Sequence, residues 1–381
     1  MRARAALPAC LLAATPATAQ DRPQEQIHDQ AMTLTSAQAQ AAPDKPEKKK
    51  KADLLIVPIP LSSPSLGTGA TVAAVLFYNP NHAPQPWISG IGAMATSTGT
   101  KAIGAFHTMS LGHDSVRFMM FGGYGDAKLK FYGIGSAAGN RGAHVDLEDK
   151  AILGLVQAQV RVARYFYGGV RIQYLDLDSK AEVPHPNYPD LALPPLELKS
   201  TLATIGPSLT YDSRDSSLNP RSGAYITGTW MFDARFLGSD FDHAKLQLGA
   251  SLYGALARGT TVAVRGSTCS VTKRVPFYDL CMYGQGGDLR GYETGRYRDR
   301  ASWAVQGEFR QHLFGKFGAV AFGGLGGVAS SLQDVGRSDI LPSVGAGLRF
   351  QASKSNNVNL RLDLAFGRDG HAVYFGIGEA F

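Results

Sequence analysis

Apolar and polar side chains alternate residue by residue through most of this chain. In one run Val156, Ala158 and Val160 alternate with Gln157 and Gln159, and comparable runs of about ten residues recur along the sequence. A period of two places successive side chains on opposite faces of a β-sheet. About sixteen such runs follow one another without an intervening helical period, so the sequence predicts an all-β fold.

The same alternation would occur in a water-soluble β-sandwich, with its apolar face in the core. Three features favour a membrane: the number of runs, breaks that alternate between short turns and longer loops, and an apolar last run that ends on Phe381. In lipid every backbone donor must pair within the chain, so a closed barrel is the only all-β solution. The sequence therefore predicts a transmembrane antiparallel β-barrel of about 16 strands, with both ends on one side of the membrane.

The two ends of the predicted barrel carry glycines. The first predicted strand, 66–78, contains Gly67 and Gly69, and the last, 372–381, contains Gly376 and Gly378. Strand glycines weaken pairing, so they would allow a seam between these two strands to open; the alternative is that they are bends without function. Two further predicted strands cover 116–124 and 128–137.

The N-terminal region divides into two predicted segments. Residues 1–19 have the pattern of a secretory signal peptide: a positive start, a short apolar run and a small-x-small cleavage site. An alternative is lipoprotein processing at Cys10. It is the weaker one because the apolar run before Cys10 is too short. Residues 20–53 are rich in Gln, Ala, Pro and Lys and predict a disordered periplasmic arm, either a solvated tether or a contact for a partner or a lipid surface. The barrel is predicted over 54–381.

The net charge of +7 would suit either nucleic acid or an anionic membrane surface. A signal peptide followed by alternating strands argues against nucleic acid. The expected location is therefore the bacterial outer membrane, and the expected partners are outer-membrane lipid and the phosphates of lipopolysaccharide.

Two cysteines follow the predicted signal peptide, Cys269 and Cys281. In an oxidising compartment they could form a disulfide, and the alternative is a pair of buried free thiols. Neither has the His or further Cys nearby that a zinc site needs, so no metal is predicted. Because there is no Gly-x-Ser-x-Gly elbow, and His107 and His312 stand apart from any Ser or acid partner, neither a catalytic site nor a cofactor is predicted.

The segment 269–302 is too long for a simple turn, and it carries the tetrad Leu289-Arg290-Gly291-Tyr292. Further motifs lie at 211–223, a strand-turn-strand stretch with Asp-Ser-Arg-Asp and Asn-Pro-Arg-Ser-Gly, at 308–310 and at 344–381. In this order they resemble the bacterial surface antigen family, outer-membrane barrels of the BamA and TamA type. The resemblance covers residues 54–381 and implies that the segment 269–302 folds back into the lumen.

The resemblance also implies a partner for Arg290. An Arg inside a barrel is costly without an acidic partner, and alternation points Glu308 and Asp363 inward. We therefore expect Arg290 to meet Glu308 first and Asp363 second. Relatives often carry another inward Asp on the strand after Glu308, where this chain has glycines. The alternative is that Arg290 is simply one of several lumen arginines.

The resemblance supports the fold better than the mechanism, because relatives carry periplasmic POTRA domains and residues 20–53 are too short for one. One hypothesis is a reduced insertion or translocation factor that works with periplasmic partner proteins or unfolded client proteins. A second is a passive or gated pore, which inward arginines would make anion-preferring. A third is a structural outer-membrane protein.

Overall fold

The computed structural model describes residues 52–63, 66–80, 87–181, 187, 191–193, 195–216, 219–284, 288–353 and 358–381. The predicted signal peptide and all but the last two residues of the predicted arm lie outside the described residues. Strand β1 begins at Ala52, so it takes in the last two residues of the segment that we assigned to the arm.

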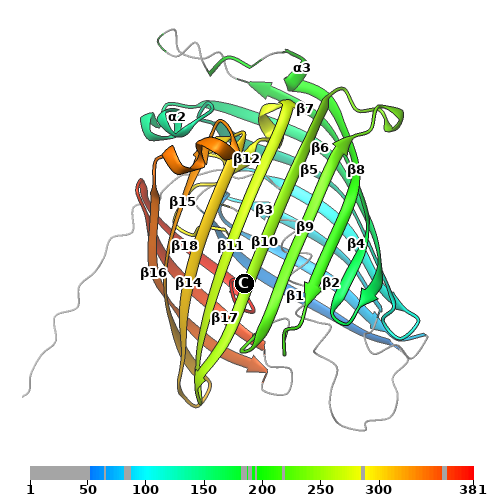
Figure 1. Ribbon diagram of the computed structural model, residues 1–381, viewed down its shortest axis with the longest axis vertical. Helices are drawn as coiled ribbons and strands as arrows, with labels where there is room; N and C mark the ends of the chain where they lie inside the picture. Colours follow the sequence, from blue (N-terminus) through cyan, green and yellow to red (C-terminus); the bar gives the residue numbers. More distant parts are fainter. Residues whose placement is uncertain are drawn as a thin grey trace, which may run out of the picture.

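One antiparallel sheet of sixteen strands makes up most of the structure (Figure 1). Each strand pairs with the next in the chain, except that β11 pairs with β14 across the insertion that holds β12 and β13. The strands are β1 (Ala52–Ser63), β2 (Gly67–Tyr78), β3 (Trp87–Thr96), β4 (Lys101–Leu111), β5 (Val116–Phe131), β6 (Val145–Ala163), β7 (Phe166–Ala181), β8 (Lys199–Asp212), β9 (Gly223–Asp233), β10 (Asp242–Ala257), β11 (Thr260–Arg274), β14 (Ala301–Phe314), β15 (Phe317–Ala329), β16 (Leu341–Ser353), β17 (Val358–Gly367) and β18 (Gly370–Ile377). The first and last strands, β1 and β18, lie in contact, so the sheet curls into the predicted barrel.

Short helices lie in the connections between strands. They are α2 (Ser136–Arg141), α3 (Pro195–Leu198), η2 (Arg235–Leu237), η3 (Phe277–Asp279) and η4 (Leu332–Arg337). In the part of the chain that the structure describes, none of the helices has the length and apolar character needed to cross a bilayer.

The two ends of the barrel differ in their connections. Two-residue turns at 164–165, 258–259 and 315–316 lie at one end, whereas the longest connections, including those with α2, α3 and η4, gather at the other, the top of Figure 1. Bacterial barrels have short periplasmic turns and longer external loops. The short-turn end is therefore the periplasmic end, and the start of β1 and the end of β18 both lie there, as an even strand count requires.

The wall of the barrel is apolar outside and polar inside. On β14 the outward Val305 and Phe309 are 48% and 47% exposed, whereas the inward Gln306 and Glu308 are 0% and 2% exposed. Strand registers carry this inside-outside assignment from one strand to the next round the sheet. The outward face is thus the surface that contacts lipid.

Strands β5 to β8 reverse this pattern near their external ends. On β5 the side chains of Ala127, Leu129 and Phe131 are buried inside, while Lys128 and Lys130 lie outside. Charged outer residues indicate that these strands continue into water above the bilayer. On the inner face of these strands, near their external ends, lies a buried apolar cluster.

Two of our strand predictions were wrong. β1 precedes the predicted first strand. The single strand β5 takes in the predicted strand 116–124 and only the first four residues of the predicted strand 128–137, whose last two residues begin α2. The strand count is unchanged because one error adds a strand and the other removes one. In β5, Gly125 is buried inside and Asp126 pairs outside with Lys101 and Lys150, so residues typical of a turn continue the ladder.

The predicted seam, between strands 66–78 and 372–381, was consequently wrong on its N-terminal side. Gly67 and Gly69 lie on β2, which pairs with β1 on one edge and β3 on the other. The strand that faces β18 is β1, whose sequence contains Pro58 and Pro60 instead of glycines.

Candidate functional site

The segment between β11 and β14 folds back into the barrel, as the resemblance implied. It contains η3 and a two-stranded sheet made of β12 (Cys281–Met282) and β13 (Arg298–Asp299). A disulfide joins Cys269, on the inner face of β11, to Cys281, with an S–S distance of 1.99 Å. The base of this inward-folded loop is thereby attached covalently to the barrel wall.

Replacing Cys281 with serine should loosen the base of the loop without unfolding the barrel. The disulfide closes a short segment, with a sequence separation of 12, and bridges of this length contribute about 3 kcal/mol or less. We expect a lower midpoint for urea unfolding, with the sixteen strands intact by circular dichroism. The Cys269→Ser variant should behave identically; a midpoint equal to that of the wild type in both would contradict a stabilising bond.

Arg290 lies at the tip of the loop and is 1% exposed. One guanidinium nitrogen, Nη1, donates to Asp363 Oδ2 on β17 at 2.6 Å, and the other, Nη2, donates to Glu308 Oε1 on β14. Nε donates to Gln306 Oε1 at 3.2 Å, and the guanidinium lies 3.4 Å from the centre of the Phe322 ring. The structure therefore brings Arg290 between both acidic residues that the sequence suggested for it.

More arginines share these two carboxylates. Arg310 Nη2 lies 2.7 Å from Glu308 Oε2, and Arg349 Nη1 lies 2.5 Å from Asp363 Oδ1. Glu379, which follows β18, accepts a further bond from Arg349 Nε at 2.6 Å. Buried charges are tolerated when each is paired and hydrogen-bonded. The network thus joins the loop tip to β14, β16 and β17 and to the residues that follow β18.

The rest of the tetrad is also in place. Gly291 has a φ of 102°, and a Cβ there would lie 2.8 Å from the Gly367 nitrogen, so only glycine fits. Its own nitrogen donates to the Tyr374 hydroxyl at 2.9 Å. Tyr292 donates from its hydroxyl to the Pro342 carbonyl at 2.6 Å. Leu289 is fully buried in a cluster with inner residues of β14, β15 and β16.

The glycines on β15 make room for this loop. A Cβ at Gly324 would lie 2.8 Å from Leu289 Cδ1, and one at Gly326 would lie 2.6 Å from the hydroxyl of Tyr283. These glycines stand where relatives were expected to carry an acid. In this chain the wall at that point is shaped for close packing, and Asp363 supplies the second carboxylate from β17.

The external part of the loop caps the lumen. Phe277 and Tyr278 of η3 join the apolar cluster inside β5 to β8, with the Phe277 and Phe131 rings 5.3 Å apart. Asp279 accepts bonds from Lys245 at 2.9 Å and His243 at 2.8 Å. Burial alone would raise the pKa of Asp279, but the nearby Lys245 charge and the His243 hydrogen bond lower it to about 2. The loop is therefore anchored at its base, its cap and its tip.

Three other lumen arginines, Arg171, Arg265 and Arg361, have no carboxylate partner among the residues that the structure describes. Arg171 donates to Gln157 at 2.8 Å, and Arg265 donates to Ser251 at 3.2 Å. Within the described part of the chain, Arg265 Nε and both Nε and Nη1 of Arg361 are buried without a hydrogen-bond partner. All three lie nearer the periplasmic ends of their strands. The periplasmic half of the lumen therefore carries excess positive charge.

Several members of the site were not predicted. Gln306 and Phe322 contact Arg290, and Glu379 completes the ion network. Gln306 precedes Glu308 by two residues, so alternation places it on the same inner face and could have identified it. Glu379 lies beyond the last strand, where alternation carries no information.

Comparison with solved structures finds similar barrels. The chain resembles BamA from Haemophilus ducreyi lacking POTRA domains 1–3, with a TM-score of 0.59 and 14% identity, over 87% of this chain and 70% of that one. It also resembles CdiB from Escherichia coli, with a TM-score of 0.60 and 14% identity, over 87% of this chain and 63% of that one. CdiB from Acinetobacter baumannii gives a TM-score of 0.58 and 11% identity, with 87% and 60% covered. A search of curated proteins found no match.

A match between the amino-acid sequence and a family model identifies the family. The Omp85 superfamily domain matches residues 65–381, which include β2 to β18 and the whole inward-folded loop. With an apolar outer wall, short turns at one end and a charged lumen, the structure has the features of an outer-membrane barrel. The chain belongs to the Omp85 superfamily and is a β-barrel of the bacterial outer membrane.

Proposed function

We propose that this barrel inserts or translocates other proteins at the outer membrane by opening between β1 and β18. One observation carries the proposal. Among the described residues, hydrogen-bonded ladders join every other pair of neighbouring strands, whereas β1 and β18 are in contact without one. A barrel wall that lacks one ladder has a preferred place to separate.

The prolines of β1 strengthen this argument. β1 forms a continuous ladder with β2 through Pro58 and Pro60. Proline has no N–H to donate, so in a strand it is found with its nitrogen on the edge away from the ladder. That edge faces β18. Because the two prolines are two residues apart, their nitrogens point to the same edge of β1. They therefore remove two backbone N–H donors from the seam and weaken any ladder that could form there.

On β18, Gly376 has a packing role as well. A Cβ at this position would lie 2.7 Å from Arg361 Nε, so the glycine makes room for a lumen arginine. The seam is therefore weakened mainly from the β1 side. Client segments of complementary chemistry are unfolded β-strands, because their free backbone groups can pair with an exposed strand edge.

The proposal is tested by insertion into vesicles. The purified barrel is reconstituted in phospholipid vesicles, and an unfolded outer-membrane barrel protein is added. We expect its folding, followed by protease protection, to be faster than in vesicles with an equal amount of a barrel from outside the superfamily. Equal rates with and without the protein would refute an insertion role.

A second candidate function is a gated, anion-preferring pore, which the three arginines without a carboxylate partner among the described residues favour. With the loop displaced, Arg171, Arg265 and Arg361 would line an aqueous path and attract anions. In an Arg290→Ala barrel, in which the loop is expected to leave the wall, we expect the reversal potential across a KCl gradient to shift toward that of chloride. The shift should be smaller when Arg265 is also replaced with glutamine. A cation preference would exclude this function.

A further inference from the structure

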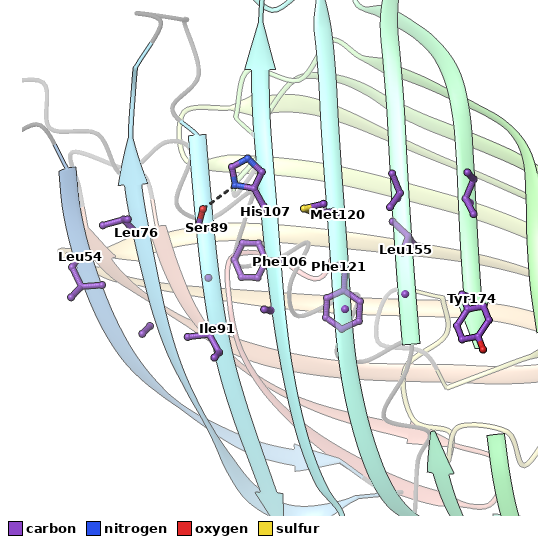
Figure 2. A pocket seen from close by; sticks show the side chains of 17 residues that line it. Leu54, Leu76, Ser89, Ile91, Phe106, His107, Met120, Phe121, Leu155 and Tyr174 are labelled. Atoms are coloured by element: carbon purple, nitrogen blue, oxygen red, sulfur yellow. Dashed lines mark hydrogen bonds between the residues drawn. The ribbon is translucent and has the colours of Figure 1, made fainter. Parts of the chain in front are cut away.

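The outer wall of the barrel contains a groove that neither the loop nor the seam uses. It has a volume of about 790 Å³ and crosses β1 to β7 (Figure 2). Leu54, Leu76 and Met120 lie along it, and Tyr174 lies at its β7 end. Most of its lining is apolar.

Strand registers place this groove on the lipid face. Leu76 pairs with Ser89, Ser89 with His107, and His107 with Met120. Met120 in turn pairs with Val156. Side chains of directly paired residues lie on the same face of a sheet, and Met120 and Val156 are exposed on the outer wall. The whole row, including the polar Ser89 and His107, therefore faces the bilayer.

A row of small residues forms the floor of the groove. Ala105, Gly122 and Gly154 are paired across β4, β5 and β6. The row on the periplasmic side contains Met120 and Val156, and the row on the external side contains larger side chains again. A row of missing side chains between two rows of large ones makes a trough across the wall, the shape that an extended hydrocarbon chain can fill.

Polar groups lie at the periplasmic edge of the trough. Ser89 Oγ is 2.9 Å from His107 Nδ1 and 3.3 Å from the Tyr78 hydroxyl (Figure 2 shows the first contact). Trp87, paired with Tyr78, has its ring 5.8 Å from that of His107. Among the described residues none bonds to His107 Nε2. An imidazole nitrogen thus faces the membrane without a protein partner.

The depth of this imidazole matches the ester region of a lipid. Tyr and Trp side chains mark the membrane interface in barrels, so Tyr78 and Trp87 place the periplasmic interface. His107 lies one row further in, which is about 5 Å along the membrane normal for a tilted strand. Polar groups inside the membrane are costly unless paired, and the polar groups available to Nε2 at this depth are the glycerol esters and phosphate of a phospholipid.

We propose that this groove is a binding site for a diacyl glycerophospholipid of the periplasmic leaflet. One acyl chain lies over Ala105, Gly122 and Gly154, and the ester or phosphate oxygens accept a hydrogen bond from His107 Nε2. Ser89 fixes the imidazole through Nδ1. The site begins at β1, so the bound lipid lies beside the strand that forms one side of the proposed seam.

The test uses variants that fill the trough without disturbing the fold. A Cβ at Gly122 would meet its nearest atom at 3.8 Å and one at Gly154 at 3.7 Å, so leucines there project outward without a clash. Gly307 is the matched control, because it lies on the lipid face of β14 with nothing within 4 Å of its Cβ. His107→Leu removes the polar contact alone. The barrels are loaded from vesicles of phosphatidylethanolamine and analysed by native mass spectrometry.

We expect one retained phosphatidylethanolamine on the wild type and on Gly307→Leu. Retention should be about tenfold weaker in Gly122→Leu/Gly154→Leu and in His107→Leu. Heat-modifiable migration on gels verifies that each variant is folded, and His107→Leu keeps the test decisive if the double variant is not. Equal retention in all four proteins, no retained lipid on the wild type, or capture of lipopolysaccharide instead would overturn the proposal.

Discussion

Replacing Arg290 with alanine should convert a barrel that is mostly closed to ions into one that conducts steadily in planar bilayers. The guanidinium is the only part of the inward-folded loop, within the described residues, that is paired with Glu308 and Asp363. Removing one partner of a buried ion pair costs about 3–5 kcal/mol, because the buried carboxylates are left without a compensating positive charge. The loop tip should then leave the wall, while the disulfide keeps its base attached.

Two further variants separate the latch from general damage to the lumen. Arg290→Lys keeps the charge but cannot bridge two carboxylates in the same way, so it should conduct partially. Arg117→Ala removes a bidentate pair with Asp114 at 2.9 and 2.7 Å near a periplasmic turn, away from the loop, and should stay closed. A wild-type channel that is already open, or an Arg290→Ala channel that stays shut, would mean that Arg290 does not hold the plug.

Locking the seam should abolish client insertion while the barrel remains folded. Cysteine pairs stepped along β1 and β18 would identify one that crosslinks, and the oxidised protein is then compared with the same protein carrying one cysteine of the pair. The expected effect is complete loss of the acceleration in the vesicle assay, because separation of β1 from β18 is the proposed route.

The matched control is a lock elsewhere in the wall. Val72 on β2 and Ala93 on β3 are directly paired, and a Val72→Cys/Ala93→Cys crosslink should leave insertion unchanged, since that ladder is continuous. Full activity of the seam-locked barrel would refute lateral opening and leave a route through the lumen. Loss of activity in both locked proteins would instead indicate that overall barrel rigidity is the cause.

The alternation of side chains was sufficient to predict most of the barrel, and it failed where strand residues are atypical. β1 contains Pro58 and Pro60, which are unfavourable within a ladder, and only the edge position makes them acceptable. In β5, Gly125 and Asp126 are typical of a turn, but the strand continues, with Gly125 buried inside and Asp126 paired outside with Lys101 and Lys150. Alternation also cannot tell a lipid-facing from a lumen-facing apolar row, which is why the reversal on β5 to β8 was not anticipated.

Predicting the loop site required the family resemblance as well as the alternation of side chains. Alternation alone places Glu308 and Asp363 inside the barrel but does not say which of the lumen arginines they meet. The tetrad around Arg290 suggested the partners, and the structure brings the three groups together. The role of the glycines on β15 depends on the fit of the folded loop, and Glu379 lies beyond the last strand; no local pattern in the sequence encodes either.

The most direct test of the proposed function is to crosslink a client during its insertion. A photoreactive amino acid replaces Ile56 on β1 in one protein and Val264 on β11 in another; both positions are exposed on the lipid face. The account predicts that an unfolded barrel client crosslinks strongly at Ile56 and only at background level at Val264. Equal crosslinking at both positions, or none at Ile56 while insertion proceeds, would contradict entry of clients at the β1 edge.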